Sequence, residues 1–270
     1  MIPMRSLTFL LALASALAGC AGTSAPPKQE PLPDLEQQTA SGPPVAADPR
    51  ERAKVHTDLG LAYLRDGQYE VALNEAKIAI EAQDGYAPAY NLKGLVHMVL
   101  GQNSEAEAAF RQALALAPGN PEISNNYGWF LCQTGRVKDS FAHFNKALSN
   151  PLYKTPATAL HNMGVCALLD KDDVTAESYL FRALKLDPND LRAYYLLAEI
   201  DYRRGRYEDA REWLRKLHEK IEPTAETVWL SLRIDRKLGD RKSEAANMGL
   251  LRGKFRDSPE YLLMMRGAFD

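Results

Sequence analysis

From residue 53 onward, small and apolar residues recur with a period near 34 residues. A small residue recurs at the same place in the first half of each period. Seven residues later comes a glycine in all but one case, and a second stretch with helical apolar spacing follows. The small residues are Gly60, Gly94, Gly128, Gly164 and Ala198; the turn residues are Gly67, Gly101, Gly135, Lys171 and Gly205. This pattern predicts pairs of antiparallel helices that touch at small side chains and reverse at glycine.

The pattern resembles the tetratricopeptide repeat, in which a Gly or Ala in each of two helices allows them to cross closely. Five repeats are clear, at residues 53–86, 87–120, 121–156, 157–190 and 191–224. A sixth, 225–258, is expected to be degenerate, with Gly239 and Ala245 one residue out of step. Since no repeat buries its apolar face alone, we expect an all-α, right-handed α-solenoid of about six repeats.

Residues 259–270 are predicted to form a short C-terminal capping helix over the last open face. The residues expected to cover that face are Tyr261, Leu262, Leu263 and Met264.

The first residues have the form of a secretory signal. Arg5 precedes the apolar stretch Leu7–Ala18, and small residues lead directly into Cys20. This ending resembles a bacterial lipobox, which implies removal of residues 1–19 and acylation of Cys20. The alternative is an ordinary signal peptide with a coincidental cysteine. Ala21, in place of an aspartate, favours outer-membrane sorting in the lipoproteins that this segment resembles.

Seven prolines fall between residues 21 and 50, among many Ser, Thr, Gln and Ala residues. Such a composition neither forms a helix nor buries a core, so residues 20–52 are predicted to be a lipidated cysteine followed by a tether. We expect a protein that faces the periplasm and is attached to the outer membrane by its acyl chains. A required spacer and an unselected N-terminus both remain open.

Composition and motifs argue against several function classes. The net charge of −2 gives no field that favours nucleic acid. We find no catalytic motif, and the five histidines share no ligand spacing, so no enzyme, small-molecule substrate, metal or cofactor is expected beyond the lipid on Cys20.

Two cysteines remain once Cys20 is set aside. Cys132 and Cys166 fall in the middle of the first helices of adjacent repeats. Such helices run about 8–10 Å apart, which allows a disulfide if the side chains face each other. Oxidation is expected in the periplasm; two buried free thiols are the alternative.

The concave groove is the candidate partner-binding site. Positions two, five, nine, twelve and thirteen of each first helix are expected to line it, with aromatic and amide side chains suited to a peptide. The predicted groove residues are Asn91, Leu95, Asn125, Trp129, Gln133, His161, Val165, Tyr195, Tyr202 and Trp229.

Residues 125–132, with the sequence Asn-Asn-Tyr-Gly-Trp-Phe-Leu-Cys, are more distinctive than the repeat pattern. Together with the lipobox, the tether and six repeats, they resemble the PilF/PilW family of type IV pilus biogenesis lipoproteins. That resemblance implies a pilotin that binds the pilus secretin and assists its localisation or multimerisation, for pilus assembly and twitching motility. The alternative is a periplasmic repeat lipoprotein that serves as an adaptor for peptidoglycan enzymes or proteases.

Overall fold

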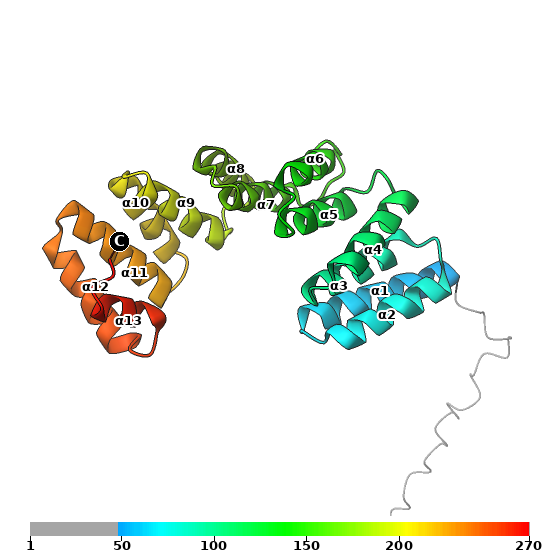
Figure 1. Ribbon diagram of the computed structural model, residues 1–270, viewed down its shortest axis with the longest axis horizontal. Coiled ribbons are helices and arrows are strands. Elements are labelled where there is room, and N and C mark those ends of the chain that lie inside the picture. The colour runs from blue at the N-terminus through cyan, green and yellow to red at the C-terminus, as the bar shows by residue number, and fades with distance from the viewer. Residues whose placement is uncertain (1–47, 270) are drawn as a thin grey trace, which may run out of the picture. The chain divides into compact units, whose positions relative to one another are not determined.

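The structure is a computed structural model that describes residues 48–269. Within this range every regular element is an α helix, and the helices form consecutive antiparallel pairs (Figure 1). The predicted signal peptide, Cys20 and the segment up to residue 47 lie outside the described residues. None of the helices between residues 48 and 269 combines the length and apolar content that crossing a bilayer requires.

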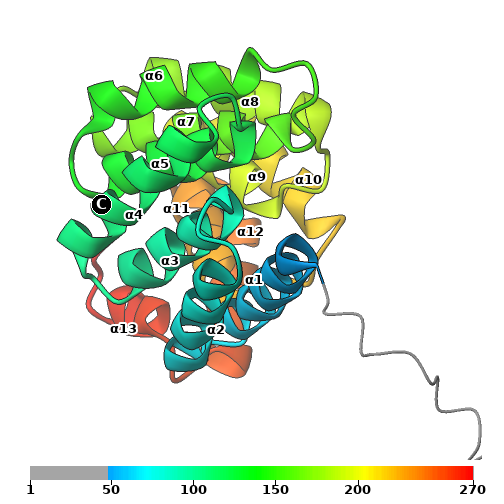
Figure 2. The same ribbon diagram turned by 90° about the vertical axis from the view of Figure 1, so that its right-hand side faces the viewer.

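Six helix pairs and one further helix make up the described part of the chain. The pairs are α1 (Pro49–Arg65) and α2 (Tyr69–Ala82), α3 (Ala87–Val99) and α4 (Asn103–Leu116), α5 (Pro121–Gln133) and α6 (Val137–Leu148), α7 (Pro156–Leu169) and α8 (Asp173–Leu186), α9 (Leu191–Arg203) and α10 (Tyr207–His218), and α11 (Ala225–Leu238) and α12 (Arg241–Lys254), followed by α13 (Pro259–Met265). Each pair stacks on the next in chain order (Figure 2). The predicted all-α solenoid is confirmed.

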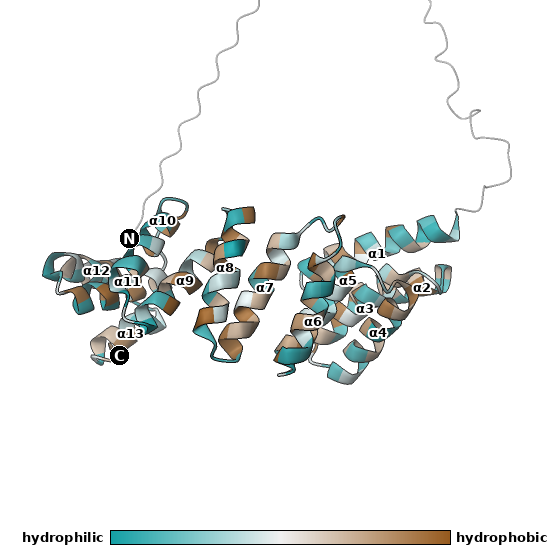
Figure 3. Ribbon diagram, turned by 90° about the horizontal axis from the view of Figure 1, so that it is seen from above, coloured by the Kyte–Doolittle hydropathy of each residue, from teal (hydrophilic) through white to brown (hydrophobic). Residues whose placement is uncertain are grey.

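The core runs along the stack between helices. Most helices carry apolar and polar residues on different sides (Figure 3), as expected of amphipathic helices that bury one face. The largest fully buried side chains come from both helices of the pairs, such as Phe110 on α4, Phe130 on α5 and Phe144 on α6. Buried apolar residues therefore form several clusters along the stack, most of which join neighbouring repeats, rather than one central core.

Glycine permits the close crossing of the two helices in three of the pairs. A Cβ built on Gly94 lies 2.9 Å from the ring of Phe110, and one on Gly128 lies 3.0 Å from that of Phe144. On Gly164 it lies 2.6 Å from Leu180 Cγ. A larger residue at these sites forces the paired helix away, because buried rings and branched side chains in a packed interior have no free space to move into.

The first helix begins earlier than expected. We placed the start of the repeats at Ala53, whereas α1 begins at Pro49. The Asp48 carboxylate accepts the Arg50 backbone N–H at 3.1 Å, and proline is well suited to the first helical turn, where its missing N–H has no partner to lose. Pro49, counted with the tether prolines, is thus a helix start.

The turn of the sixth repeat is in register, which corrects our prediction for Gly239, whereas Ala245 does fall one residue after the alanine position of the other repeats. Gly239 ends α11 with φ 73°, the same left-handed conformation as Gly205, which lies 34 residues earlier. The repeat departs instead at its small positions. Leu232 stands where the other repeats have Gly or Ala, and Glu244 is buried where four of the others have alanine. Glu244 is held by ion pairs to Arg236 at 3.1 Å and Arg241 at 2.8 Å.

The last helix caps the stack with only half of the predicted residues. Tyr261 and Met264 pack against Val228, Trp229 and their neighbours, whereas Leu262 and Leu263 are exposed. Residues three apart share a helix face, so turning Tyr261 and Met264 inward directs the two leucines outward. The helix ends at Met265, and residues 266–269 continue as a tail.

Lys171 occupies the turn position that glycine holds in the other repeats. It has φ 61°, and it is the one described non-glycine residue with positive φ. The five equivalent glycines have φ between 70° and 82°. The turn geometry of the repeat is therefore kept without glycine, at the steric cost that a Cβ incurs in the left-handed region.

We predict that Lys171→Gly stabilises the protein by about 0.5–1 kcal/mol, because the relief of Cβ strain exceeds the added entropy of the unfolded chain. The free energy of unfolding from urea titration measures the effect. Gly135→Lys, the reciprocal change at the equivalent turn, is the matched control and should destabilise. Equal stability of Lys171→Gly and the wild type would contradict the prediction.

Candidate functional site

The predicted groove residues lie on the first helices of repeats two to six. Neighbouring first helices contact each other directly in the pairs α3–α5, α5–α7 and α9–α11. The structure therefore places these residues on adjacent helices, but it gives them different environments. Some face open space, some are used in packing and some are covered by the chain itself.

The open part of the groove lies at repeats two and three. Trp129 and Gln133 on α5 and Met98 on α3 line a cavity of about 330 Å³. Trp129 is half-buried and Gln133 is exposed, so a ligand can reach both an indole face and an amide. Leu95 is partly buried and packs against the cluster that contains Phe110 and Phe130. It therefore contributes to the packing under this site rather than facing a ligand.

A chain of asparagine amides crosses three first helices beside this cavity. Asn126 Nδ2 donates to Asn91 Oδ1 at 3.2 Å, Asn125 Nδ2 donates to Asn126 Oδ1 at 3.4 Å, and Asn162 Nδ2 donates to Asn125 Oδ1 at 3.2 Å. These bonds connect α3, α5 and α7. One buried amide, Asn125, and three partly buried ones thus bond to one another and fix the helices relative to each other.

Two of these asparagines were missed by the sequence analysis, and one that it selected is not open. Asn125 is only 6 % exposed, so its amide serves the network and not a ligand. Asn126 and Asn162 fall one place after the expected ligand position of their repeats. Their recurrence at the same repeat position is the signal that could have identified the network.

His161 and Val165 on α7 are used in packing and capping. His161 Nδ1 lies 2.6 Å from Asp190 Oδ2, and Asp190 Oδ1 accepts the Ala193 backbone N–H that starts α9. Burial alone raises the pKa of Asp190, but the bond and charge of His161 and the backbone N–H groups outweigh it, so the pKa is lowered. Val165 packs against the core between repeats four and five. These residues stabilise the repeat junction.

The aromatic residues predicted at repeats five and six are buried, contrary to expectation. Tyr195, Tyr202 and Trp229 are each 7–8 % exposed. The Tyr195 hydroxyl donates to Glu199 at 3.2 Å, and burial with the adjacent carboxylates raises the pKa of Tyr195. Tyr202 and Trp229 contact Phe269, from the tail after α13. That contact joins residues far apart in the sequence, so no local sequence pattern could predict it.

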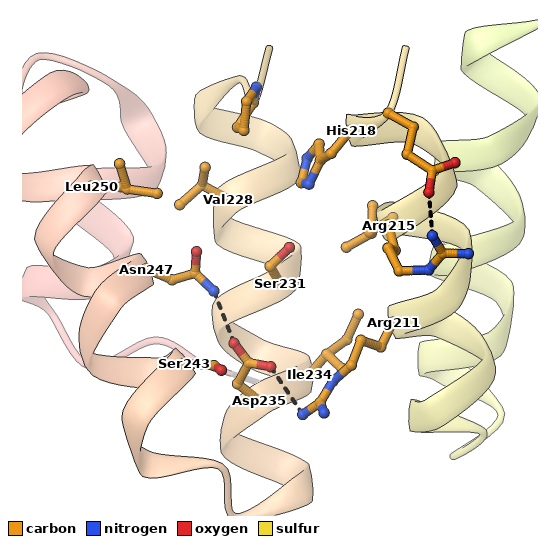
Figure 4. Close-up of a pocket in the computed structure, with 13 residues that line it drawn as sticks. Arg211, Arg215, His218, Val228, Ser231, Ile234, Asp235, Ser243, Asn247 and Leu250 are labelled. Carbon is orange, nitrogen blue, oxygen red and sulfur yellow. Dashed lines mark hydrogen bonds and ion pairs between the residues drawn. The ribbon is translucent and has the colours of Figure 1, made fainter. Parts of the chain in front are cut away.

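A larger cavity, of about 560 Å³, lies between α10 and α12 over one face of α11 (Figure 4). At its base, Asp235 accepts from Arg211 Nη2 at 3.1 Å and from Asn247 Nδ2 at 2.8 Å. Burial raises the pKa of Asp235, and the Asn247 and Arg211 contacts oppose that rise. Arg211 Nη2, Asp235 and Asn247 pair with one another in a structural network, whereas the buried Arg211 Nε has no hydrogen-bond partner. Among residues 48–269, no three His, Cys, Asp or Glu side chains form a group that could hold a metal ion.

A disulfide joins the first helices of repeats three and four. Cys132 on α5 and Cys166 on α7 are bonded, with their Cα atoms 5.8 Å apart and both residues buried. They pack with Phe144 and Met163. The covalent bond holds α5 against α7, and its two cysteines are next in sequence to the predicted groove residues Gln133 and Val165.

Comparisons with known proteins agree with this architecture. Tetratricopeptide repeat models match residues 57–121, 91–154 and 167–225. The type IV pilus assembly protein PilF of Pseudomonas aeruginosa is 28% identical over 257 residues, which cover 95% of each chain. The crystal structure of PilW, a type IV pilus biogenesis factor, superposes with a TM-score of 0.73 and 31% identity over 79% of this chain and 98% of PilW. The chain belongs to the PilF/PilW family of type IV pilus biogenesis proteins.

A second member of the PilF/PilW family has a similar fold. The structure of Pseudomonas aeruginosa PilF has a TM-score of 0.72 and 25% identity, and the match covers 81% of this chain and 99% of PilF. Membership of the PilF/PilW family supports a role in type IV pilus assembly. It also places the groove on a repeat scaffold, the kind of surface that binds other proteins.

Removing the disulfide should destabilise the protein. For a closed loop of this size, the chain-entropy model gives about 3–4 kcal/mol. We predict that Cys132→Ala/Cys166→Ala lowers the free energy of unfolding by about that amount and that reductant lowers the thermal midpoint of the wild type.

The double variant provides the control, because reductant should not change its midpoint. If wild-type protein shown by mass spectrometry to be fully reduced keeps its midpoint, the prediction is wrong.

Proposed function

We propose that this PilF/PilW family member is an outer-membrane lipoprotein facing the periplasm that acts as a pilotin. In this proposal it binds the pilus secretin through the open groove at repeats two and three and assists secretin localisation or multimerisation. The carrying observation is the cavity lined by Met98, Trp129 and Gln133, in a chain that matches PilF over 95% of its length.

The shape and chemistry of this groove support a peptide ligand. The Trp129 indole offers apolar area at small entropic cost, and the exposed Gln133 amide offers both a donor and an acceptor to a peptide backbone. The asparagine network and the disulfide hold α3, α5 and α7 in place before binding. Such preorganisation reduces the free energy lost on ordering the site.

The proposed lipid on Cys20 supplies the second part of the mechanism. The predicted tether extends to residue 52, but α1 begins at Pro49. Residues 21–48 span about 90 Å at about 3.1 Å per residue in the polyproline conformation. A groove confined this close to the membrane meets a membrane-bound partner at a raised effective concentration. No cofactor is proposed beyond the acyl chains, and no catalysis is needed: binding and confinement account for delivery.

We predict that a photo-crosslinking amino acid at position 133 captures the secretin in intact cell envelopes. The control places the same amino acid at position 145, an exposed site on α6, a second helix of its repeat, and should capture none. Capture of peptidoglycan enzymes or proteases without the secretin would favour the alternative adaptor function. Equal secretin capture from both positions would remove the groove from the proposal.

The anchor requires a separate experiment. Cys20→Ala, exported by a conventional cleavable signal peptide, should fold with wild-type circular dichroism but leave fewer secretin multimers in the outer membrane. Fractionation followed by detection of heat-resistant multimers measures this. Normal outer-membrane secretin rings in the Cys20→Ala strain would show that the lipid is not needed.

A further inference from the structure

The tail after α13 turns back onto the groove. Gly267, with φ 70°, follows the helix and reverses the chain. The backbone N–H groups of Gly267 and Ala268 donate to Met264 O at 3.0 Å and Leu263 O at 3.1 Å, which closes the end of α13. The reversal brings Phe269 over α9 and α11.

Phe269 is bound there by two kinds of contact. Its ring lies between the Trp229 indole, with centroids 5.4 Å apart, and the Arg236 guanidinium, 4.2 Å from the ring centroid. Its backbone carbonyl accepts from Arg233 Nε at 3.1 Å and from the Tyr202 hydroxyl at 3.5 Å. The ring contacts select an aromatic side chain, and the bonds to the carbonyl suit any peptide backbone.

These contacts come from groove positions of the repeat. Trp229 holds the position in its repeat that Asn91 and Asn125 hold in theirs, and Arg233 holds the position of Trp129. Arg233 also lies over the Tyr202 ring at 4.3 Å, so its guanidinium is oriented before it meets the carbonyl. The tail therefore occupies the groove at repeats five and six as a peptide ligand does.

We propose that the groove over α9 and α11 is a second binding site, for a partner segment that presents an aromatic side chain and the backbone carbonyl of that residue. In the free protein, Phe269 of the tail occupies this site as an intramolecular competitor that the partner segment displaces. The site lies on other repeats than the cavity at Trp129, and the inference does not depend on the identity of the pilus partner.

The tail predicts the chemistry of the partner. Gly267 and Ala268 are exposed and bond to the end of α13, so the groove is contacted by Phe269, through its ring and its carbonyl. A segment that presents an aromatic side chain together with the backbone carbonyl of the same residue satisfies the same groups. A tethered competitor has a high effective concentration, typically near the millimolar range, so the partner segment must compete with the tail.

The test uses a fluorescein-labelled peptide with the sequence of residues 264–270, Met-Met-Arg-Gly-Ala-Phe-Asp, and the full-length chain. Fluorescence anisotropy should show binding to Phe269→Ala at least tenfold tighter than to the wild type, because the site is vacated. Phe269→Tyr keeps an aromatic ring and should behave as the wild type. A peptide with alanine in place of phenylalanine should not bind.

A second substitution locates the site. Adding Arg233→Gln to Phe269→Ala should weaken peptide binding at least tenfold, since the donor to the carbonyl is lost. Adding Arg203→Gln, which removes an α9 arginine paired with Asp173 away from the tail, should leave binding unchanged. No binding to a Phe269→Ala protein with wild-type circular dichroism, or binding that survives Arg233→Gln, would overturn the proposal.

The wild-type protein gives an independent readout if Phe269→Ala does not fold. Millimolar unlabelled peptide should displace the tail and move the amide NMR resonances of Gly267, Ala268 and Phe269 toward those of an unstructured chain. Tail resonances that do not move at saturating peptide would equally overturn the proposal.

Discussion

In three of the repeats, the two helices meet where the backbone of one touches a bulky side chain of the other. Gly94 faces Phe110, Gly128 faces Phe144 and Gly164 faces Leu180, with no room for a Cβ. This approach sets the crossing of each pair and thereby the spacing of the first helices that form the groove. The cavity at Trp129, the asparagine network and the disulfide all depend on that spacing, since each spans neighbouring first helices.

Much of the fold could be predicted from the sequence because its determinants are local and periodic. Gly60 and its equivalents identify the helix contacts, and the turn residues identify the reversals, including Lys171, which adopts the glycine conformation. The site was less predictable. Tyr202 and Trp229 hold groove positions, yet Phe269 covers them through contacts that join distant residues. Repeat position alone does not specify the partner of a side chain. It could not show that Asn125 bonds to Asn162 rather than facing a ligand.

The groove is divided into two chemically different parts. At repeats two and three, an indole and an amide face open space around a cavity. At repeats five and six, a tryptophan, a tyrosine and two arginines hold the chain's own tail. Between them, the His161–Asp190 contact and the packing of Val165 stabilise the repeat junction. If a partner segment displaces the tail, as we propose, the scaffold can bind two distinct segments, of one partner or of two.

The disulfide between α5 and α7 has a mechanical consequence. Solenoids bend by small changes at each junction between repeats, and the bond between Cys132 and Cys166 prevents repeats three and four from separating. Bending is therefore concentrated at the other junctions, on either side of a stiff central block. A force applied through a bound partner would therefore move repeats three and four as one unit, and the change of shape would occur at the junctions on either side of them.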